Sequence, residues 1–400
     1  MTELSPKRRR AALLSLALGG FGIGATEFVA MGLLPQTVSS LLPELWATDQ
    51  DQALARGGLI ISAYALGVVV GAFTLAIATV RLPRKVAVTG FCVAFTVGSL
   101  LAFAAPGFWW LVAARFLAAL AHGAYFGFAS LIAAEIMGPG SRGKGIAFVL
   151  SGLTVANVIG VPLITVLGQH AGWRAAYLAV AAIFALATVA IWLFVPRQPG
   201  NPNASMRGEL RVFKRPQVWL TLAIGSIGFG GFFAVYSYVS PMVTDLAGLP
   251  QSWVPVTLVV IGIGMTVGTL VGGRAADRGA LQTLVKVYPW FIGALAVLGM
   301  FAATPAVLLI FLLAMATLSS VMMPAIQTRL LDVSGDAQSL ASALNHASLN
   351  IGNSIGAALG GLVISMGLGL TAPAWLGAAL ATIGLGLALL SGLLQRRGVR

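Results

Sequence analysis

One carboxylate in this chain stands where a charge is costly. Glu27 lies in GGFGIGATEFVAMGLLP (19–35), a run that is otherwise apolar or small, whereas the remaining acids fall in termini, in loops or at the ends of apolar runs. A charge at the centre of a membrane span costs about 2.5 to 3.5 kcal/mol on insertion scales, so an acid retained there is usually functional. Apolar surroundings favour its protonated form, and water or a nearby cation favours the carboxylate. An acid whose surroundings alternate can therefore carry a proton.

A basic partner is predicted at the same depth. Arg115 lies roughly 10 Å along the helix that begins at Phe108, and Glu27 lies roughly 12 Å before Pro35 at the end of its own run. His122 follows two turns after Arg115 on the same predicted face. We predict that Glu27, Arg115 and His122 couple transport to protons. The alternative is an ion pair that only locks two helices together, beside a packed histidine.

Amide, imidazole and phenol groups indicate a polar cavity. One apolar run carries a stripe of polar residues beside its glycines, and another presents a single asparagine in the same way. A third run has two tyrosines near its outer end. The alternatives are hydrogen bonds between helices and an interfacial aromatic belt. The predicted substrate-binding residues are Asn157, Tyr236, Tyr238, His346, Asn350 and Asn353.

The composition places these residues in a membrane protein. Of 400 residues, 58% are hydrophobic and 9% are charged, which excludes an ordinary soluble protein. The net charge of +13 could suggest nucleic-acid binding, but the charges fall between long apolar runs, so we expect no nucleic-acid partner. Cys92 is the single cysteine, so neither a disulfide within the chain nor a cysteine-based zinc pattern is available. We expect no metal and no cofactor.

Twelve segments have the roughly 20 apolar residues that a bilayer-spanning helix needs. The sequence therefore predicts an all-α membrane protein with two pseudo-symmetric bundles of six helices. Its predicted parts are an N-terminal bundle (1–195), a cytoplasmic linker (196–217) and a C-terminal bundle (218–400). The predicted spans are 12–35, 57–79, 86–104, 108–134, 145–167, 173–195, 218–246, 253–275, 284–303, 305–329, 340–365 and 372–394.

The basic residues predict the orientation. Of the 24 lysines and arginines, 21 fall on the side of the N-terminus, Arg56 and Arg174 fall on the other side, and Arg115 lies within a span. Because basic residues are retained in the cytoplasm, both termini are expected there.

Small residues at four-residue spacing predict close helix packing and an internal repeat. Such stripes occur in the second, fifth, eighth and eleventh spans, which suggests a three-span unit repeated four times. The stripes are Ala63/Gly67/Gly71, Gly152/Ala156/Gly160, Gly264/Gly268/Gly272 and Gly352/Gly356/Gly360. Aligning Pro35 with Pro241 places Glu27 opposite Phe233, so the second half has no acid at the equivalent position.

Together these patterns resemble the major facilitator superfamily, and within it the drug:proton antiporter branch that includes sugar and chloramphenicol efflux permeases. The resemblance covers essentially the whole chain. It rests on GGFGIGATEFVAMGLLP, ISAYALGVVVGA (61–72), ARFLAALAHGAYFG (114–127), GLTVANVIGVPL (152–163), FGGFFAVYSYVSPMVTDLAG (229–248) and NHASLNIGNSIGAALGG (345–361).

The resemblance implies export of a small molecule in exchange for protons, by rocking of two halves about a central cavity. It makes Arg115 the arginine of the fourth-span motif. It also makes Gly152, Gly160 and Pro162 the antiporter motif, although GVPL replaces the adjacent Gly-Pro of the family.

The family's gating loops are only partly present. After the second span, Val80 stands where the family has Asp, and the matching residues are Arg81, Arg84 and Lys85. The second-half copy, GGRAADRG (272–279), keeps Asp277 and Arg278. We therefore predict a charge-based gate latch at the second loop.

The leading hypothesis is a proton-coupled exporter of a neutral or weakly polar molecule, such as chloramphenicol, a sugar or another metabolite. It would act as a monomer in the cytoplasmic (inner) membrane of a bacterium, with the lipid bilayer and a small-molecule substrate as partners and the proton gradient as its energy source. The alternatives are proton-coupled uptake and a non-transporting membrane sensor. No enzyme is expected, because the Gly352–Gly356 match to a hydrolase nucleophile elbow lies in a glycine packing stripe rather than at a strand-to-helix turn.

Overall fold

The computed structural model describes residues 5–79, 81–138, 141–198, 209–335 and 338–397. Within these ranges the chain is helical and has no strand, and eleven helices are long and apolar enough to cross a membrane. One of them, α14 (Trp253–Phe301), has 49 residues, which at the helical rise would be about 74 Å, twice the thickness of a bilayer core. It is interrupted at Gly279 (φ 154°), so α14 holds two spans. The prediction of twelve spans in an all-α membrane protein is confirmed.

The chain folds into two compact units. The first comprises Met1–Val29 and Gly67–Ser205, and the second comprises Ala30–Leu66 and Met206–Arg400. Consequently α1 (Pro6–Gly32) and α4 (Gln50–Thr79) each begin in one unit and end in the other. The predicted domain boundaries at 195 and 218 stay a prediction, and residues 199–208 of the predicted linker lie outside the described ranges.

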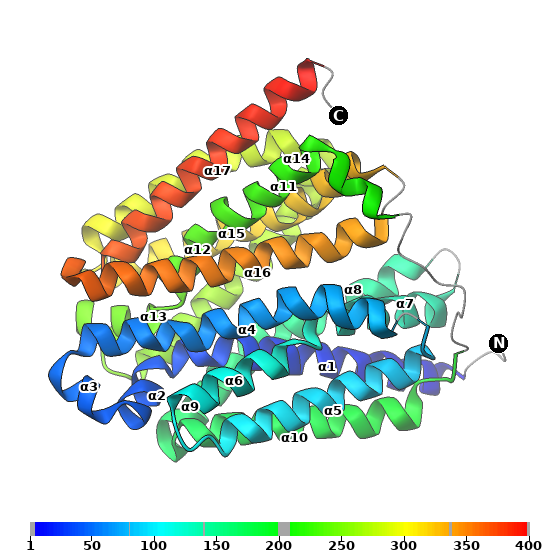
Figure 1. Ribbon diagram of the computed structural model, residues 1–400, viewed down its shortest axis with the longest axis horizontal. Helices are drawn as coiled ribbons and strands as arrows, with labels where there is room; N and C mark the ends of the chain where they lie inside the picture. Colours follow the sequence, from blue (N-terminus) through cyan, green and yellow to red (C-terminus); the bar gives the residue numbers. More distant parts are fainter. Residues whose placement is uncertain (1–4, 80, 139–140, 199–208, 336–337, 398–400) are drawn as a thin grey trace. The chain divides into compact units, whose positions relative to one another are not determined.

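The first unit holds most of the first span, the end of the second span and spans three to six, and two of these are interrupted (Figure 1). The fourth span breaks at Leu120 and Ala121, and the fifth contains a π-helical turn, η1. Besides α1 and the end of α4, its helices are α5 (Arg84–Phe103), α6 (Phe108–Ala119), α7 (His122–Met137), α8 (Arg142–Val155), η1 (Ala156–Gly160), α9 (Val161–Ala171) and α10 (Trp173–Phe194).

The π-helical turn has a local cause in Pro162. This proline lies in the first turn of α9, where it donates no hydrogen bond and its ring crowds the carbonyl one turn earlier. The helix widens to a π turn directly before it, at Ala156–Gly160. The antiporter-motif residues Gly152, Gly160 and Pro162 therefore flank a helix irregularity, which carries Asn157.

The glycine stripes of the first unit show which helices approach closely. A Cβ atom on Gly67 or Gly71 of α4 would overlap the carbonyl oxygen of Phe116 or Leu120, respectively, at the end of the fourth span. A Cβ on Gly152 would overlap the backbone of α1 at Ala17. The second span thus packs on the fourth, and the fifth packs on the first.

The second unit holds the remaining spans together with two short helices that follow α1 (Figure 1). Its seventh span is the most irregular, because it consists of short α-helical and π-helical pieces. Besides the start of α4 and α14, its helices are α2 (Leu34–Leu41), α3 (Pro43–Thr48), η2 (Glu209–Lys214), α11 (Pro216–Ala223), η3 (Ile224–Gly228), α12 (Gly230–Tyr236), α13 (Val239–Pro241), η4 (Met242–Leu246), α15 (Pro305–Ser334), α16 (Gln338–Val363), η5 (Ile364–Leu368) and α17 (Ala372–Arg396).

The glycine stripes of the second unit repeat the pairing of the first. A Cβ on Gly268 would overlap the carbonyl oxygen of Thr317 in α15, and a Cβ on Gly356 of α16 would overlap that of Gly230 in α12. The eighth span therefore packs on the tenth and the eleventh packs on the seventh. In both units the middle helix of one three-span repeat packs on the first helix of the other, which supports the predicted internal repeat.

Candidate functional site

Glu27 is a buried acid in the middle of α1. Only 7% of its surface is exposed. Gly20 and Gly24, two turns and one turn earlier, face the fifth span at Val149 and Ala156, respectively. Glu27 follows on the same side of α1, so its carboxylate is carried towards protein, as the sequence predicted.

Arg115 of α6 reaches the segment that carries Glu27. Its guanidinium Nη1 donates to the carbonyl oxygen of Thr26 at 2.6 Å and to Thr26 Oγ1 at 3.1 Å, and Nη2 donates to the carbonyl oxygen of Glu27 at 3.4 Å. The same guanidinium lies 5.8 Å from the ring centroid of Tyr177 in α10. Arg115 is 1% exposed. The structure thus brings the two predicted coupling residues together across the first and fourth spans.

His122 is buried, seven residues after Arg115 in the fourth span. The fourth span is interrupted at Leu120 and Ala121, and His122 begins α7. The interruption lies where Gly71 of α4 contacts the backbone of Leu120. The imidazole packs 5.5 Å from the ring centroid of Phe126. Leu120 and Ala121 keep right-handed helical backbone angles, and the shared face of Arg115 and His122 stays a prediction.

Asn157 is the polar residue of the π-helical turn in the fifth span. It is buried, and its turn lies against α1, because Ala156 meets Gly24. A π turn inserts one extra residue into a helix and is frequent at functional sites. Asn157 therefore belongs to the same helix pair as Glu27.

The position equivalent to Glu27 in the second unit is filled by an aromatic cluster. Phe233 of α12 lies with its ring centroid 5.1 Å from that of Phe232 and 5.6 Å from that of Phe229. Phe232 in turn lies 5.1 Å from Tyr236, and Tyr236 is buried. The twin of the first span is thus apolar where the first span is acidic.

The asparagines of α16 are buried, whereas His346 is partly exposed, and two of the amide oxygens have unmet hydrogen-bonding capacity. Asn350 Nδ2 donates to the carbonyl oxygen of His346 at 3.0 Å, and Asn353 is buried one turn further on. In the described part of the chain, Oδ1 of Asn350 and Oδ1 of Asn345 have no hydrogen-bond partner. A buried acceptor without a partner is costly, so these atoms are suited to a ligand that carries hydroxyl or amide donors. The sequence prediction missed Asn345, whose only signal was its place directly before His346.

Tyr238 is engaged in helix packing in this structure. Its hydroxyl donates to the carbonyl oxygen of Ala357 at 2.6 Å, and its ring contacts the positions of Gly58 and Gly361. Donation of a hydrogen bond from this hydroxyl to a substrate would first require the Ala357 bond to break.

The loop after the second span contains an ion pair. Arg84 Nη1 lies 3.0 Å from Oε2 of Glu135, which is in the last turn of α7. Both side chains are about one-third exposed. Lys85 Nζ lies 5.3 Å from the ring centroid of Trp192, while Arg81 is exposed. Glu135 was not predicted as a partner, because its place at a span end gave no indication of what it would meet.

The corresponding loop of the second unit differs. Asp277 and Arg278 are exposed, and in the described ranges neither forms an ion pair. Val80, which replaces the acid of the first loop, lies outside the described residues. The gate latch expected at Asp277 and Arg278 stays a prediction.

A buried polar cluster of the second unit was not predicted. Arg329 of α15, the last residue of the predicted span 305–329, is 5% exposed. Its Nη2 donates to Gln217 Oε1 and to Ser391 Oγ at 3.0 Å each, and Ser391 Oγ donates to Gln217 Oε1 at 2.7 Å. The cluster joins the seventh, tenth and twelfth spans. One sequence signal was present, because the apolar run continues past Arg329 into Leu330 and Leu331.

Comparison with known proteins supplies the family. Residues 16–303 match the family model described as Major Facilitator Superfamily. The chain is 34% identical over 357 residues to the inner membrane transport protein YdhP of Escherichia coli strain K12, covering 89% of this chain and 90% of that protein. It is 31% identical over 367 residues to a chloramphenicol resistance protein of Streptomyces lividans, covering 91% of each. A crystal structure titled as a bacterial homolog of the human lysosomal transporter Spinster, inward-facing and unoccupied, matches with a TM-score of 0.73 at 17% identity, covering 97% of this chain and 98% of that one.

Proposed function

The chain belongs to the major facilitator superfamily and is a multi-pass membrane transporter of a small molecule rather than an enzyme, and from this premise we propose that it exports its substrate in exchange for protons. Glu27 carries the proton. Arg115 fixes the helix segment around Glu27, and His122 and Asn157 form its buried polar surroundings.

The observation that carries this proposal is the burial of Glu27 beside Arg115. Burying an acid inside an apolar helix costs free energy, and Glu27 is only 7% exposed. Its presence there is best explained by a function of its protonation state. The equivalent position of the second unit is Phe233, which packs among aromatic rings, so the helix architecture itself does not require an acid there. A residue that the fold does not need is better explained by coupling.

Proton entry supplies enough free energy for export. One proton gains about 2.3 kcal/mol per 100 mV of membrane potential and about 1.4 kcal/mol per pH unit. At one-to-one exchange, a neutral substrate could be concentrated on the order of hundreds-fold. A single acid is therefore sufficient for a useful gradient.

The substrate class follows from the polar residues of α16. Asn345 and Asn350 offer buried amide oxygens, and His346 and Asn353 lie on the same helix. Such groups recognise hydroxyl and amide donors, which favours a neutral or weakly polar compound such as an amphenicol, a sugar or a nucleoside. Tyr236 supplies an aromatic wall. The name of the Streptomyces relative, a chloramphenicol resistance protein, supports export as the direction.

We place the transporter in the bacterial inner membrane as a monomer, with both termini in the cytoplasm. The asymmetric distribution of basic residues supports this orientation. The name of the Escherichia coli relative, an inner membrane transport protein, supports the membrane.

The decisive experiment separates proton coupling from substrate exchange. A thermal-shift panel of chloramphenicol, neutral sugars and nucleosides at two pH values first identifies a substrate, because a ligand stabilises the native state. Inside-out proteoliposomes then measure uptake driven by a pH gradient and, separately, counterflow, which needs no net proton movement. We expect Glu27→Gln to reduce gradient-driven uptake at least tenfold and to retain counterflow.

Glu44→Gln is the matched control, because Glu44 is exposed in α3 outside the spans. It should leave both activities unchanged. Proton-driven transport that survives in Glu27→Gln would remove Glu27 from the mechanism. Loss of both activities together with a lower melting temperature would make Glu27 part of a structural lock. Inward accumulation in right-side-out vesicles would indicate uptake, and binding without transport would indicate a sensor.

A further inference from the structure

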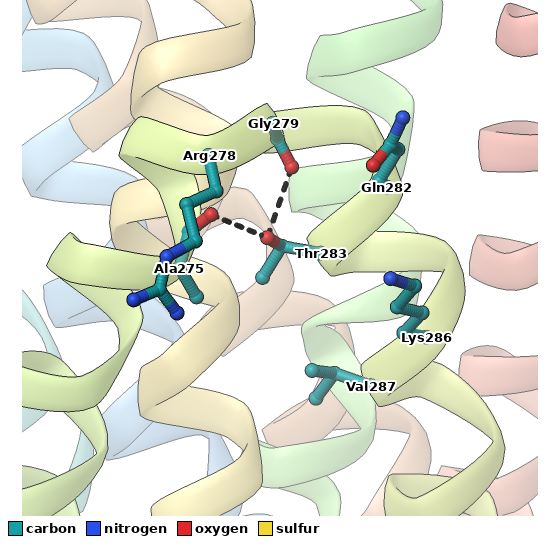
Figure 2. Close-up of a pocket in the computed structure, with 7 residues that line it drawn as sticks. All are labelled: Ala275, Arg278, Gly279, Gln282, Thr283, Lys286 and Val287. Atoms are coloured by element: carbon teal, nitrogen blue, oxygen red, sulfur yellow. Dashed lines mark hydrogen bonds between the residues drawn. The ribbon is translucent and has the colours of Figure 1, made fainter.

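A small hollow lies at the break between the two spans of α14. Its volume is about 220 Å³, and Figure 2 shows its lining residues around the turn at Gly279. Arg278 and Lys286 extend from the two sides of the hollow, and Gln282 lies between them along the chain. The walls are completed by small or apolar side chains, including Ala275 and Val287.

The backbone around the hollow is held in place by local bonds. Gly279 has a φ of 154°, which allows the chain to leave one helix and enter the next without side-chain strain. Thr283 Oγ1 lies 2.9 Å from the carbonyl oxygens of both Ala275 and Gly279, as the dashed lines of Figure 2 show. The Thr283 hydroxyl therefore ties the second helix to the end of the first, and it fixes the spacing of the two basic residues.

The hollow has an excess of positive charge. Arg278 and Lys286 both line it, and in the described part of the chain neither has a carboxylate within ion-pair distance, although Asp277 is adjacent in sequence. Gln282 adds an amide that can donate hydrogen bonds. A guanidinium, an ammonium and an amide around one small volume match the oxygens of a phosphate group.

The surroundings of the hollow favour a lipid as the source of that phosphate. Trp290 lies one turn beyond Lys286 on α14 and is 74% exposed. On the other span, Leu270 and Val271 are 62% and 49% exposed, two turns before Arg278. A basic hollow bordered by exposed apolar side chains can hold a headgroup while the acyl chains lie along the helices. Inorganic phosphate has no acyl chains, so these exposed apolar side chains would contribute nothing to its binding.

We propose that the hollow binds the phosphate of an anionic phospholipid, of the phosphatidylglycerol or cardiolipin type, with Arg278 and Lys286 as the charged ligands. The charge distribution of the chain assigns the break at Gly279 in the middle of α14 to the cytoplasmic leaflet. The lipid would then anchor the turn at Gly279 between the eighth and ninth spans. The site is separate from the residues proposed for proton coupling.

The test compares lipid binding in the wild type and in the double variant Arg278→Gln/Lys286→Gln. Delipidated protein in detergent is titrated with phosphatidylglycerol, and bound lipid is counted by native mass spectrometry. Because each basic residue near a membrane surface strengthens binding about fivefold, we expect the double variant to bind about 30-fold more weakly. Phosphatidylcholine, which has no net charge, should bind the wild type no better than phosphatidylglycerol binds the double variant.

Arg396→Gln/Arg397→Gln is the matched control, since both arginines are exposed at the end of α17 on the same predicted side. It should retain the tight phosphatidylglycerol adduct. Equal binding by the wild type and the Arg278/Lys286 double variant would overturn the proposal, and so would equal losses in both double variants. If millimolar inorganic phosphate displaced the lipid and raised the melting temperature as much as the lipid does, the site would be one for free anions instead. Melting temperatures without lipid confirm that each variant is folded.

Discussion

Arg115 holds the backbone of α1 at Thr26, one residue before the buried Glu27. Its Nη1 donates to the carbonyl oxygen of Thr26 at 2.6 Å and to the hydroxyl of the same residue at 3.1 Å. Neither acceptor titrates, so this part of the contact is the same whether Glu27 is protonated or ionised. Arg115 can therefore hold the helix in position while the acid next to it changes charge.

Replacing Arg115 by lysine should separate its charge from its geometry. A lysine keeps the positive charge but cannot supply the fork that reaches Thr26 and the Glu27 carbonyl together. We expect Arg115→Lys to lower the free energy of unfolding by about 1 to 3 kcal/mol, measured by thermal unfolding in detergent. Proton-driven transport should fall more than counterflow.

Thr26→Val is the matched variant, because it removes only the hydroxyl acceptor and leaves the carbonyl bond. Its expected cost is about 0.6 kcal/mol, the average for hydrogen bonds between membrane helices. If Thr26→Val destabilised as much as Arg115→Lys, the carbonyl contact would not be the principal anchor.

Gly152 should tolerate no side chain. A Cβ there would overlap the carbonyl oxygen of Ala17, which belongs to a rigid helix backbone. We expect Gly152→Ala to destabilise the protein by about 1 to 3 kcal/mol, because α1 and α8 must move apart. Gly127→Ala in α7 is the control, since an added Cβ there meets nothing within 4 Å. It should be neutral or stabilising by up to about 1 kcal/mol, because alanine favours helix. Equal melting temperatures for the two variants would contradict the packing of the first span on the fifth.

The glycine stripes illustrate what the sequence could and could not predict. Four-residue spacing identified the close-packed face of each middle helix, because that spacing follows from helix geometry alone. The helix that packs on each face was not predictable, since a stripe such as Gly264/Gly268/Gly272 contains no information about that helix. Only the structure shows that Gly268 faces Thr317.

The polar residues show the same limit. Glu27 stood out because an acid within an apolar run is costly wherever it lies. The burial of Arg329 in a cluster was not predicted, because its partners Gln217 and Ser391 are neutral and lie 112 and 62 residues away. His122 was placed on the Arg115 face from periodicity, and that placement stays a prediction. Periodicity did not predict the turn at Leu120 and Ala121 between α6 and α7.

The Arg329 cluster should contribute to stability through its neutral partners. Ser391→Ala removes the bond from Arg329 Nη2 and the bond to Gln217 Oε1. At about 0.6 to 1.7 kcal/mol for each hydrogen bond between helices, we expect a loss of about 1 to 3 kcal/mol in thermal unfolding. Ser365→Ala is the control, because the Ser365 hydroxyl bonds only within its own turn, to the carbonyl oxygen of Leu362. An unchanged melting temperature in Ser391→Ala would show that the cluster contributes nothing measurable.

The start of α4 packs tightly on α16 within the second unit. Ser62 Oγ donates to the carbonyl oxygen of Ser354 at 3.1 Å, and a Cβ on Gly361 would lie 2.9 Å from the carbonyl oxygen of Ala55. Tyr238 fills the space between Gly58 and Gly361. This contact joins the outer end of the second span to the outer end of the eleventh, as the predicted orientation places them.

Alternating access should require this contact to open in every transport cycle. The test uses the double variant Ser62→Cys/Ser354→Cys in a Cys92→Ala background, which removes the single native thiol. We expect copper phenanthroline to crosslink the two introduced cysteines. Transport in proteoliposomes should then fall at least tenfold and recover on reduction, because a covalent bond holds the two helices together. The single variants Ser62→Cys and Ser354→Cys should be insensitive to the oxidant. Full transport by crosslinked protein would show that these helices stay together during the cycle, and failure to crosslink would contradict the contact itself.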